Sequence, residues 1–509
     1  MARKFKTSID DAVEPFVMGL DVGSTASRGG LYDARGLPIS GYKHRVPHTF
    51  EVDTDGKSVI DAEQVVAEMR QVLDMCARPE MAGKIAGVAM DTFSASLVGV
   101  GADGIAVTPC YTYADSRCSS WVLKLREEFD EAEIQQRTGT RFHNSYLLPR
   151  FLWLRETDPD LFGRVDKWMA LGEYVYLRLA GQAIIGTAAA SWTGLLDRRT
   201  GEWDTALLDY CGVRVEQMGD IRDPDQPMTP DPELIGKSWP GLVGARWFGV
   251  IADGLASNIG AGAPDSRTMA MSAATSGAMR VILSSIPDEI PPGLWCYRVD
   301  RNRSILGGAI NDVGRAVTWL EETLAYPNEP LMGTADDDTS AQNIDANNLV
   351  LEPPKPGTPL VLPFFTGERS TGWAAGAKAM ILDVTAATKA RELYRGTMEG
   401  VALTYVRVAK QLIAASGNYP SEIRSSGRIT QDLPGWQAVL ADALDVPILP
   451  ITMKRTTLHG TVLLALETLA PNVAWEDVLL GDRFEPSEEH HKHYEDAYNR
   501  FEKAYEVLI

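Results

Sequence analysis

Cysteine is scarce in this chain and shows no pairing pattern. The 509 residues include five cysteines, none of them in a CxxC pair, namely Cys76, Cys110, Cys118, Cys211 and Cys296. Disulfide-rich secreted domains and cysteine zinc sites both need regularly spaced cysteines. The scarcity argues against both, and it indicates reduced thiols in a cytoplasmic protein.

Long hydrophobic runs and an excess of positive charge are also missing. The longest apolar stretches are strand-sized, which predicts no membrane span, and residues 1–15 lack the apolar segment of a secretory signal. Acidic residues outnumber basic ones by 69 to 49, so the formal net charge is −20. This charge argues against nucleic acid and anionic membrane surfaces as partners.

Apolar residues are abundant, at 45%, and fall into alternating strand-like and helix-like segments. This alternation is typical of an α/β fold, and the length suits two to four domains. We expect helices at 62–76, 147–154, 168–179 and 205–211, strands at 84–90, 268–273 and 278–283, a loop or hairpin at 223–240, a hinge at 260–267 and a mobile insertion at 327–359. Residues 1–15 are interpreted as a loose leader.

The segment 16–33 carries the clearest functional pattern. An apolar run leads into Asp21, a turn of small residues follows, and a second apolar run predicts the other strand of a β-hairpin. Asp21 is a hard oxygen ligand suited to hydrated Mg²⁺. Ser24, Thr25 and Arg28 offer donors to a phosphate. The alternative is a tight turn with a solvated aspartate, because a short motif is only a hypothesis until its context supports it.

Nine short motifs lie in order along residues 19–400. They are Gly19–Thr25, Asp91–Phe93, Tyr113–Arg117, Tyr146–Glu156, Ala252–Gly260, Thr275–Arg280, Gly307–Asn311, Pro363–Ser370 and Leu393–Gly400. Together they resemble the FGGY family of carbohydrate kinases, over roughly residues 16–469. Two further segments, 193–197 and 292–297, look most like the gluconokinase-type branch of that family.

The resemblance implies both a fold and a reaction. The fold would have two ribonuclease-H-like domains of the actin and hexokinase kind, at 16–264 and 265–485, with a cleft between them and a C-terminal helix at 486–509. The first domain would bind the sugar and Mg²⁺ and carry the base, and the second would bind the nucleotide. The reaction would move the γ-phosphoryl group of ATP to a hydroxyl of a sugar or sugar acid. A homodimer is expected by analogy alone.

The resemblance implies that Asp253 is the general base and that Asp21 holds Mg²⁺. Asp253 follows an apolar run and precedes a helix-like segment. A carboxylate at such a strand end can take a proton from a hydroxyl within hydrogen-bond reach. The structural alternative is that Asp253 caps the helix after it.

Two further sets of residues are candidates for ligand contacts. For the nucleotide, the resemblance implies Ser24, Thr25, Arg28, Thr275, Gly277, Gly308, Asn311, Gly427 and Arg428. For the sugar, it implies Asp91, Thr92, Tyr113, Asp115 and Arg117. The alternatives are a strand-to-helix turn with an asparagine cap for Gly308 and Asn311, and an ion pair within one loop for Asp115 and Arg117.

Several positions depart from the family pattern, among them three sites near the expected ligands. Ser94-Ala95 stands where relatives have Trp-His, Ala274 replaces a glycine of the second phosphate turn, and Arg428 replaces a glycine near the adenine. Arg428 could stack on the adenine or a phosphate, or it could block the pocket. Other functions therefore stay open, namely a xylulokinase or another ketose or polyol kinase, a sugar-binding ATPase with little transfer activity, and an actin-like filament or regulatory module.

Overall fold

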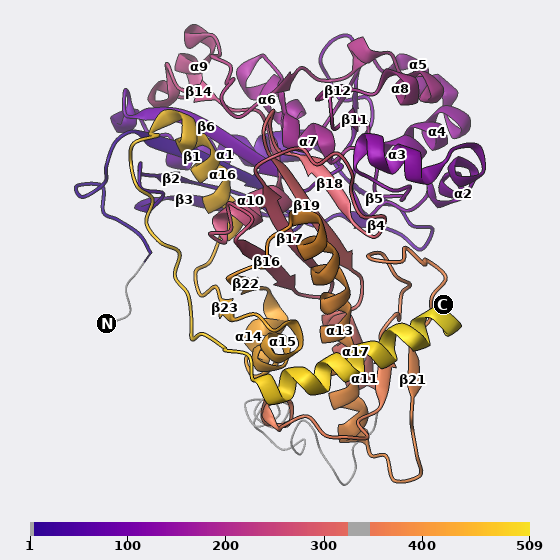
Figure 1. The fold of residues 1–509 in the computed structure, drawn as a ribbon. Coiled ribbons are helices and arrows are strands. Elements are labelled where there is room, and N and C mark those ends of the chain that lie inside the picture. The colour runs from indigo at the N-terminus through magenta and orange to yellow at the C-terminus, as the bar shows by residue number, and fades with distance from the viewer. Residues whose placement is uncertain (1–4, 324–346) are drawn as a thin grey trace.

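The computed structural model describes residues 5–323 and 347–509 of the chain. The first half of the chain builds around one six-stranded sheet and the second half around another (Figure 1). The predicted α/β character is confirmed. Most of the insertion expected at 327–359 lies outside the described residues.

The first sheet has the strand order β14-β6-β1-β2-β3, and β15 also pairs with β6. Its strands are β1 (Phe16–Val22), β2 (Ala26–Tyr32), β3 (Pro38–Pro47), β6 (Ile85–Thr92), β14 (Arg246–Trp247) and β15 (Ile251–Ala252). β1 and β2 form the predicted hairpin, with Asp21 opposite Arg28. β6 runs parallel to β1, and β14 and β15 run parallel to β6.

The second sheet, which also has six strands, has a similar plan. Its strands, in the order β18-β19-β17-β16-β22-β23, are β18 (Trp295–Arg298), β19 (Ser304–Ile310), β17 (Gly277–Leu283), β16 (Thr268–Ala273), β22 (Glu422–Ser426) and β23 (Ile448–Pro450). β16 and β17 form an antiparallel hairpin, and β22 and β23 continue the sheet in parallel. The two strand–turn–strand units seen in the sequence thus start two similar sheets.

Helices pack on both sheets and form a separate layer around residues 119–164. In the first half they are α1 (Ala62–Cys76), α2 (Ser119–Glu128), α3 (Glu131–Thr138), α4 (Leu147–Thr157), α5 (Pro159–Arg164), α6 (Leu171–Ala180), α7 (Thr187–Ser191), α8 (Thr205–Cys211), α9 (Pro232–Ser238) and α10 (Asp253–Gly260). In the second half they are α11 (Gly314–Thr323), α13 (Ala390–Ser416), α14 (Arg428–Asp432), α15 (Trp436–Leu444), α16 (Thr456–Leu469) and α17 (Glu488–Leu508). Among the described residues, no helix has the length and apolar content needed to cross a bilayer.

Short strands complete the fold. They are β4 (Glu51–Val52), β5 (Ser58–Ile60), β7 (Val98–Val100), β8 (Cys110–Tyr111), β9 (Lys167–Met169), β10 (Ile185–Gly186), β11 (Leu196–Asp197), β12 (Glu202–Trp203), β13 (Ile221–Arg222), β20 (Leu360–Leu362) and β21 (Met380–Leu382). β9 occupies the start of the helix expected at 168–179, and α6 begins only at Leu171. That helix starts where the Glu173 carboxylate accepts a hydrogen bond from the Ala170 N–H.

Two of the expected irregular segments are ordered. Within 223–240 the chain forms α9, because Asp231 accepts a hydrogen bond from the Glu233 N–H at its start and Pro232 suits the first helical turn. The leader is not loose over its described part. The Thr7 N–H donates to the Pro38 carbonyl, and the Thr7 carbonyl accepts from Ser40, so this segment extends the edge of the first sheet.

Helix α16 ties the end of the chain to the first sheet. It packs against α10 at backbone distance: a Cβ on Gly260 would lie 1.8 Å from the Thr456 carbonyl oxygen, and one on Gly460 would lie 1.9 Å from that of Ala256. Only glycine permits this approach. α16 also covers Gly19 of β1. The domain boundary near 264 stays a prediction, since the second half of the chain contributes to the packing of the first sheet.

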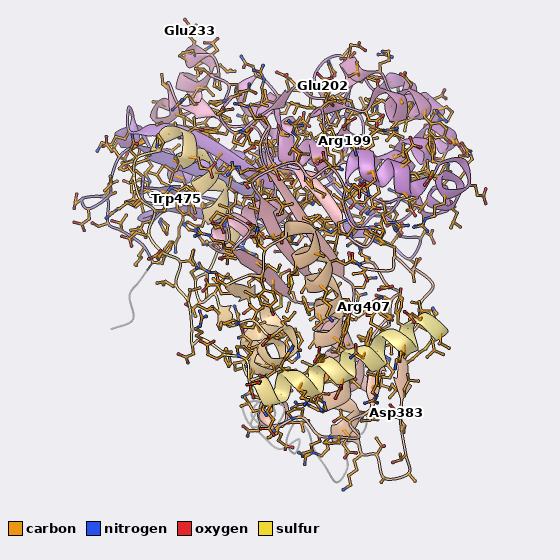
Figure 2. The ribbon with its side chains drawn as sticks, in the orientation of Figure 1. Arg199, Glu202, Glu233, Asp383, Arg407 and Trp475 are labelled. Atoms are coloured by element: carbon orange, nitrogen blue, oxygen red, sulfur yellow. The ribbon has the colours of Figure 1, made fainter. Side chains whose placement is uncertain are left out.

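The last helix, α17, lies in the segment 486–509 predicted to be helical, and it is held against α13 by charge. Arg407 of α13 lies between the two (Figure 2). Its guanidinium donates to Glu502 of α17 over 2.7 Å and to Glu368 over 2.5 Å. A buried guanidinium with two carboxylate partners fixes the position of this helix.

Stability is expected to depend on pH through Glu173. This side chain is buried, only one of its oxygens has a partner, and burial raises its pKa to about 8. Between pH ~4.5 and ~8 the native state keeps a proton that the unfolded chain has released, so the free energy of unfolding falls as pH rises. Glu173→Gln should remove this fall and stabilise the protein at pH 8 by on the order of 1–3 kcal/mol.

The measurement is urea unfolding of both proteins at several pH values. The exposed Glu202, labelled in Figure 2, provides a matched control, since Glu202→Gln should leave the pH dependence unchanged. If the free energy of unfolding changes with pH in the same way in the wild type and in Glu173→Gln, Glu173 is not the source of the pH dependence.

Candidate active site

Three aspartates stand at the ends of three neighbouring strands of the first sheet. Asp21 is opposite Asp91 in the parallel pair β1–β6, and β15 pairs with β6 immediately before Asp253. Parallel strands bring their carboxyl ends to one edge of a sheet, where α/β proteins bind ligands. The structure therefore brings together Asp21 and Asp253, the predicted metal ligand and the predicted base.

Asp21 is a buried carboxylate beside one arginine. Its side chain is 3% exposed, and Arg28 Nε lies 2.7 Å from Asp21 Oδ2. Burial raises the pKa of Asp21 to about 6; Arg28 opposes this shift, and the charge of Asp253 adds to it. A divalent cation is stabilised by such a group of nearby carboxylates, so Asp21 is the candidate metal ligand.

The side chains around Asp21 fit a cation that keeps its water. Among the residues that the structure describes, no group of three or more His, Cys, Asp or Glu side chains is arranged to hold a metal ion. Mg²⁺ binds proteins through one or two carboxylates and retains several waters, whereas Zn²⁺ needs at least three protein ligands. Asp21 is therefore a candidate ligand for hydrated Mg²⁺.

The turn after β1 is exposed and is fixed by a histidine that the sequence did not point to. Ser24 and Thr25 are exposed. His48 Nε2 lies 2.8 Å from the Gly23 carbonyl oxygen, and Nδ1 lies 2.8 Å from Glu68 Oε2. The His48 N–H donates to the Thr25 carbonyl. The hydroxyls that would meet a phosphate thus stand on a rigid turn, but no local pattern marks His48 or Glu68.

The turn between β16 and β17 resembles the first one. Thr275 is exposed there, as predicted for a phosphate contact. A Cβ on Gly277 would lie 2.0 Å from Tyr405 Oη, so the position requires glycine for packing as well. Ala274 is exposed and does not need a positive φ, so the methyl group at this departure from the family pattern fits the turn.

Gly308 and Asn311 have structural roles in the described conformation. A Cβ on Gly308 would lie 2.8 Å from a Val408 methyl, so this glycine permits close packing of β19 on α13. The Asn311 side chain donates to the carbonyls of Thr366 and Gly367 and thereby fixes the loop that follows β20. These contacts favour the structural alternative, although Asn311 bonds a loop and does not cap a helix.

Gly427 borders a groove of about 700 Å³ between β22, α14 and β23, and Arg428 is the next residue of the chain. Gly427 has φ 112°, and a Cβ there would lie 2.2 Å from the Ala273 carbonyl oxygen, so glycine is required. The Arg428 side chain is 85% exposed and pairs with Asp432 over 2.9 Å. Arg428 does not line the groove, so it does not block it in this conformation.

Asp91, a predicted sugar contact, is buried in the described conformation. It is fully buried, and its Oδ2 accepts a hydrogen bond from Thr461 of α16 over 2.5 Å. Burial and the nearby Asp21 raise the pKa of Asp91 well above its usual range, which favours a neutral carboxyl group. Thr92 is buried as well. In the described conformation both residues have structural surroundings, and their contact with a sugar stays a prediction.

Asp115 and Arg117 form the ion pair that was the alternative to sugar binding. Arg117 Nη2 lies 2.6 Å from Asp115 Oδ2, and the buried Asp115 also accepts a hydrogen bond from the Ser58 N–H. Arg117 stacks over Trp153 at 4.5 Å. Of the predicted sugar residues, Tyr113 is the accessible one, at 43% exposure.

Asp253 is partly accessible and is oriented by Ser94. It opens α10, but the capping position belongs to Ala252, and Asp253 Oδ1 instead accepts a hydrogen bond from Ser94 Oγ over 2.8 Å. Burial raises the pKa of Asp253, while Ser94 and then Arg280 lower it. Arg280 belongs to a motif noted in the sequence, yet only the structure brings it near Asp253. A raised carboxyl pKa is what a general base needs.

Comparisons with known proteins match most of the chain. The N-terminal domain of the FGGY family of carbohydrate kinases matches residues 16–228, and its C-terminal domain matches residues 269–468. Gluconokinase from Bacillus subtilis (strain 168) is 22% identical over 89% of this chain and 87% of its own length.

Solved structures are similar over nearly the whole chain. The gluconate kinase from Lactobacillus acidophilus has a TM-score of 0.85 and 24% identity, covering 97% of this chain and 98% of its own. A ligand-bound xylulose kinase from the same organism has a TM-score of 0.85 and 25% identity, with the same coverage. These matches confirm the two-domain fold of the actin and hexokinase kind.

Removal of the His48 side chain is expected to loosen the turn after β1. His48→Ala would leave the buried Glu68 carboxylate without its ring partner and should lower the free energy of unfolding by about 1–3 kcal/mol. Hydrogen exchange at residues 23–26 should become faster. His44→Ala, on the preceding strand β3, is the control, and equal exchange in both variants would exclude a fixing role for His48.

Proposed function

Because the chain belongs to the FGGY family of carbohydrate kinases, we propose that it transfers the γ-phosphoryl group of ATP to a hydroxyl of a sugar or sugar acid such as gluconate. Members of this family use ATP. The observation that carries the proposal is the placement of Asp253, a partly accessible carboxylate held by Ser94 at the end of the strand next to β6. Gluconokinase from Bacillus subtilis supports the choice of acceptor.

Each group near the carboxyl ends of the first sheet has one role in this proposal. Asp253 accepts the proton of the attacking hydroxyl, which makes the oxygen a better nucleophile. Ser94 holds that carboxylate in place. Asp21 would hold Mg²⁺, which when bound neutralises charge on the phosphates. Arg28, Ser24 and Thr25 lie on the turn that would face the phosphates, and Thr275 faces them from the second sheet.

A ketose such as xylulose is the second candidate acceptor. The xylulose kinase from Lactobacillus acidophilus has the same TM-score as the gluconate kinase from that organism. In addition, Ser94-Ala95 provides neither an aromatic wall nor an imidazole donor beside the base. The binding-ATPase alternative has less support, because neither Ala274 nor Arg428 obstructs the groove or the turn.

Loss of the Asp253 carboxylate is expected to abolish transfer. Asp253→Asn should lower kcat by about 10²- to 10⁴-fold, the usual contribution of a general base, while leaving ATP affinity nearly unchanged. The assay is ADP release with Mg-ATP against a panel of sugar acids, ketoses and polyols. Asp209→Asn, at an exposed position of α8, is the control. Unchanged transfer in Asp253→Asn would refute the assignment of the base.

The hydrogen bond from Ser94 should be visible in the pH profile. It lowers the pKa of Asp253, so Ser94→Ala is expected to raise that pKa and to move the acidic limb of the kcat/KM profile to higher pH. Ser94→Thr keeps the hydroxyl and should restore the wild-type profile. A profile that does not move in Ser94→Ala would show that this hydroxyl does not tune the base.

A further inference from the structure

Arg280 and Arg369 are half-buried and lack partners. Across residues 5–323 and 347–509, the guanidinium group of neither residue forms an ion pair or a hydrogen bond, and both Nε atoms are buried. The chain carries twenty more acidic than basic residues, and several other half-buried arginines, such as Arg28 and Arg303, are paired with carboxylates. A half-buried guanidinium without an ion-pair partner is stabilised when an anionic ligand binds to it. Arg280 and Arg369 are therefore candidates for binding an anion.

Strand alternation places Arg280 between the two halves of the molecule. In β17, Met279 and Val281 point into the core of the second sheet, so Arg280 and Ile282 point to the opposite face, toward the first sheet. Arg280 Nε lies 3.8 Å from the position that a Cβ on Gly254 would take. Gly254 directly follows the proposed base, so Arg280 borders the site where an acceptor would bind.

Arg369 reaches the same region from the loop after β20. Its neighbour Ser370 exchanges two hydrogen bonds with Ala309 of β19, both of 3.0 Å, which fixes the loop on the second sheet. The Arg369 guanidinium lies 6.0 Å from the Trp373 ring centroid. Burial lowers the pKa of Arg280, the charge of Asp253 opposes this shift, and the charge of Arg369 adds to it.

The surroundings are mostly aromatic, and Asp253 is the carboxylate whose charge acts on Arg280. Trp192 stacks on Tyr297 with ring centroids 3.8 Å apart, and the Tyr297 hydroxyl bonds that of Tyr146 over 2.6 Å. Next to Tyr146, burial and the charge of Arg369 lower the pKa of His143 to about 3, so this ring is neutral at physiological pH. Aromatic faces suit sugar carbons, and forked guanidinium groups suit a carboxylate.

We propose that Arg280 and Arg369 bind the carboxylate of the acceptor, and that the enzyme therefore prefers sugar acids to neutral sugars and polyols. This inference rests on the proposed kinase function and assigns its substrate class. A guanidinium pair matches a planar carboxylate in two-point contacts, which neutral hydroxyl groups do not replace. A site built to hold a charged group rejects analogues without it, because its own charges are then left unpaired.

The first test is ligand binding without ATP. D-Gluconate should raise the thermal unfolding midpoint of the wild type, and D-glucitol, its neutral polyol counterpart, should not. Arg369→Gln and Arg280→Gln should remove the response to gluconate. Arg267→Gln, at an exposed arginine paired with Asp265, should keep it. Each unliganded Arg280 or Arg369 variant should be at least as stable as the wild type, because a repulsive charge has been removed.

The second test is kinetic and separates this inference from the proposed function. Arg369→Gln should raise KM for gluconate by about 10- to 100-fold, the range for a lost charged hydrogen bond, with unchanged Kd for Mg-ADP. If Arg369→Gln loses as much activity with neutral acceptors as with acids, or binds Mg-ADP more weakly, the two arginines bind the phosphates. Either result would overturn the inference. If the protein phosphorylates a neutral ketose but does not bind gluconate, the sugar-acid inference is refuted and the proposed kinase function stands. If gluconate binds through the two arginines but no acceptor is phosphorylated, the proposed kinase function is refuted and the binding inference stands.

Discussion

The repulsion among three carboxylates at the ends of neighbouring parallel strands is the constraint on which the site depends. Register alone forces Asp21, Asp91 and Asp253 close together, and the protein compensates each in a different way. Asp91 is buried under Thr461, Asp21 is paired with Arg28, and Asp253 is held by Ser94 and left partly accessible. Different surroundings give similar groups different chemistry, and the roles proposed for Asp21 as a cation ligand and for Asp253 as a base follow this rule.

Local patterns were enough to predict the elements that carry the chemistry. The hairpin around Asp21, helix α1 and the strand end before Asp253 all follow from apolar runs and turn residues within about twenty positions. The two similar sheets were also visible, because each begins with a strand, a turn of small residues and a second strand. Irregular segments were predicted less well: α9 starts inside a proline-rich stretch, since Pro232 at a first helical turn initiates a helix and does not interrupt it.

The parts that sequence reasoning missed all depend on contacts between distant residues. Thr461, which buries Asp91, is 370 residues away from it and belongs to a helix that returns from the second half of the chain. His48 directly follows strand β3 and Glu68 belongs to α1, and the local patterns there predict only secondary structure. Asp115 was assigned to sugar by its motif, but in the folded chain the Ser58 N–H and Arg117 already satisfy it. A motif identifies the residue, whereas burial decides what that residue can bind.

The distribution of charge links the chemistry to the joining of the two halves. A protein with a net charge of −20 repels anionic ligands at long range, so affinity for them must come from a few cations held close to the site. Arg28 comes from the first sheet and Arg280 from the second, and Asp253 lies near both Asp21 and Arg280. An anion bound at Arg280 would reduce the repulsion between Arg280 and Arg369 in the second half of the chain. A cation bound at Asp21 would reduce the repulsion between Asp21 and Asp253 in the first half. Filling both sites therefore favours the arrangement in which the base, the phosphates and the acceptor meet.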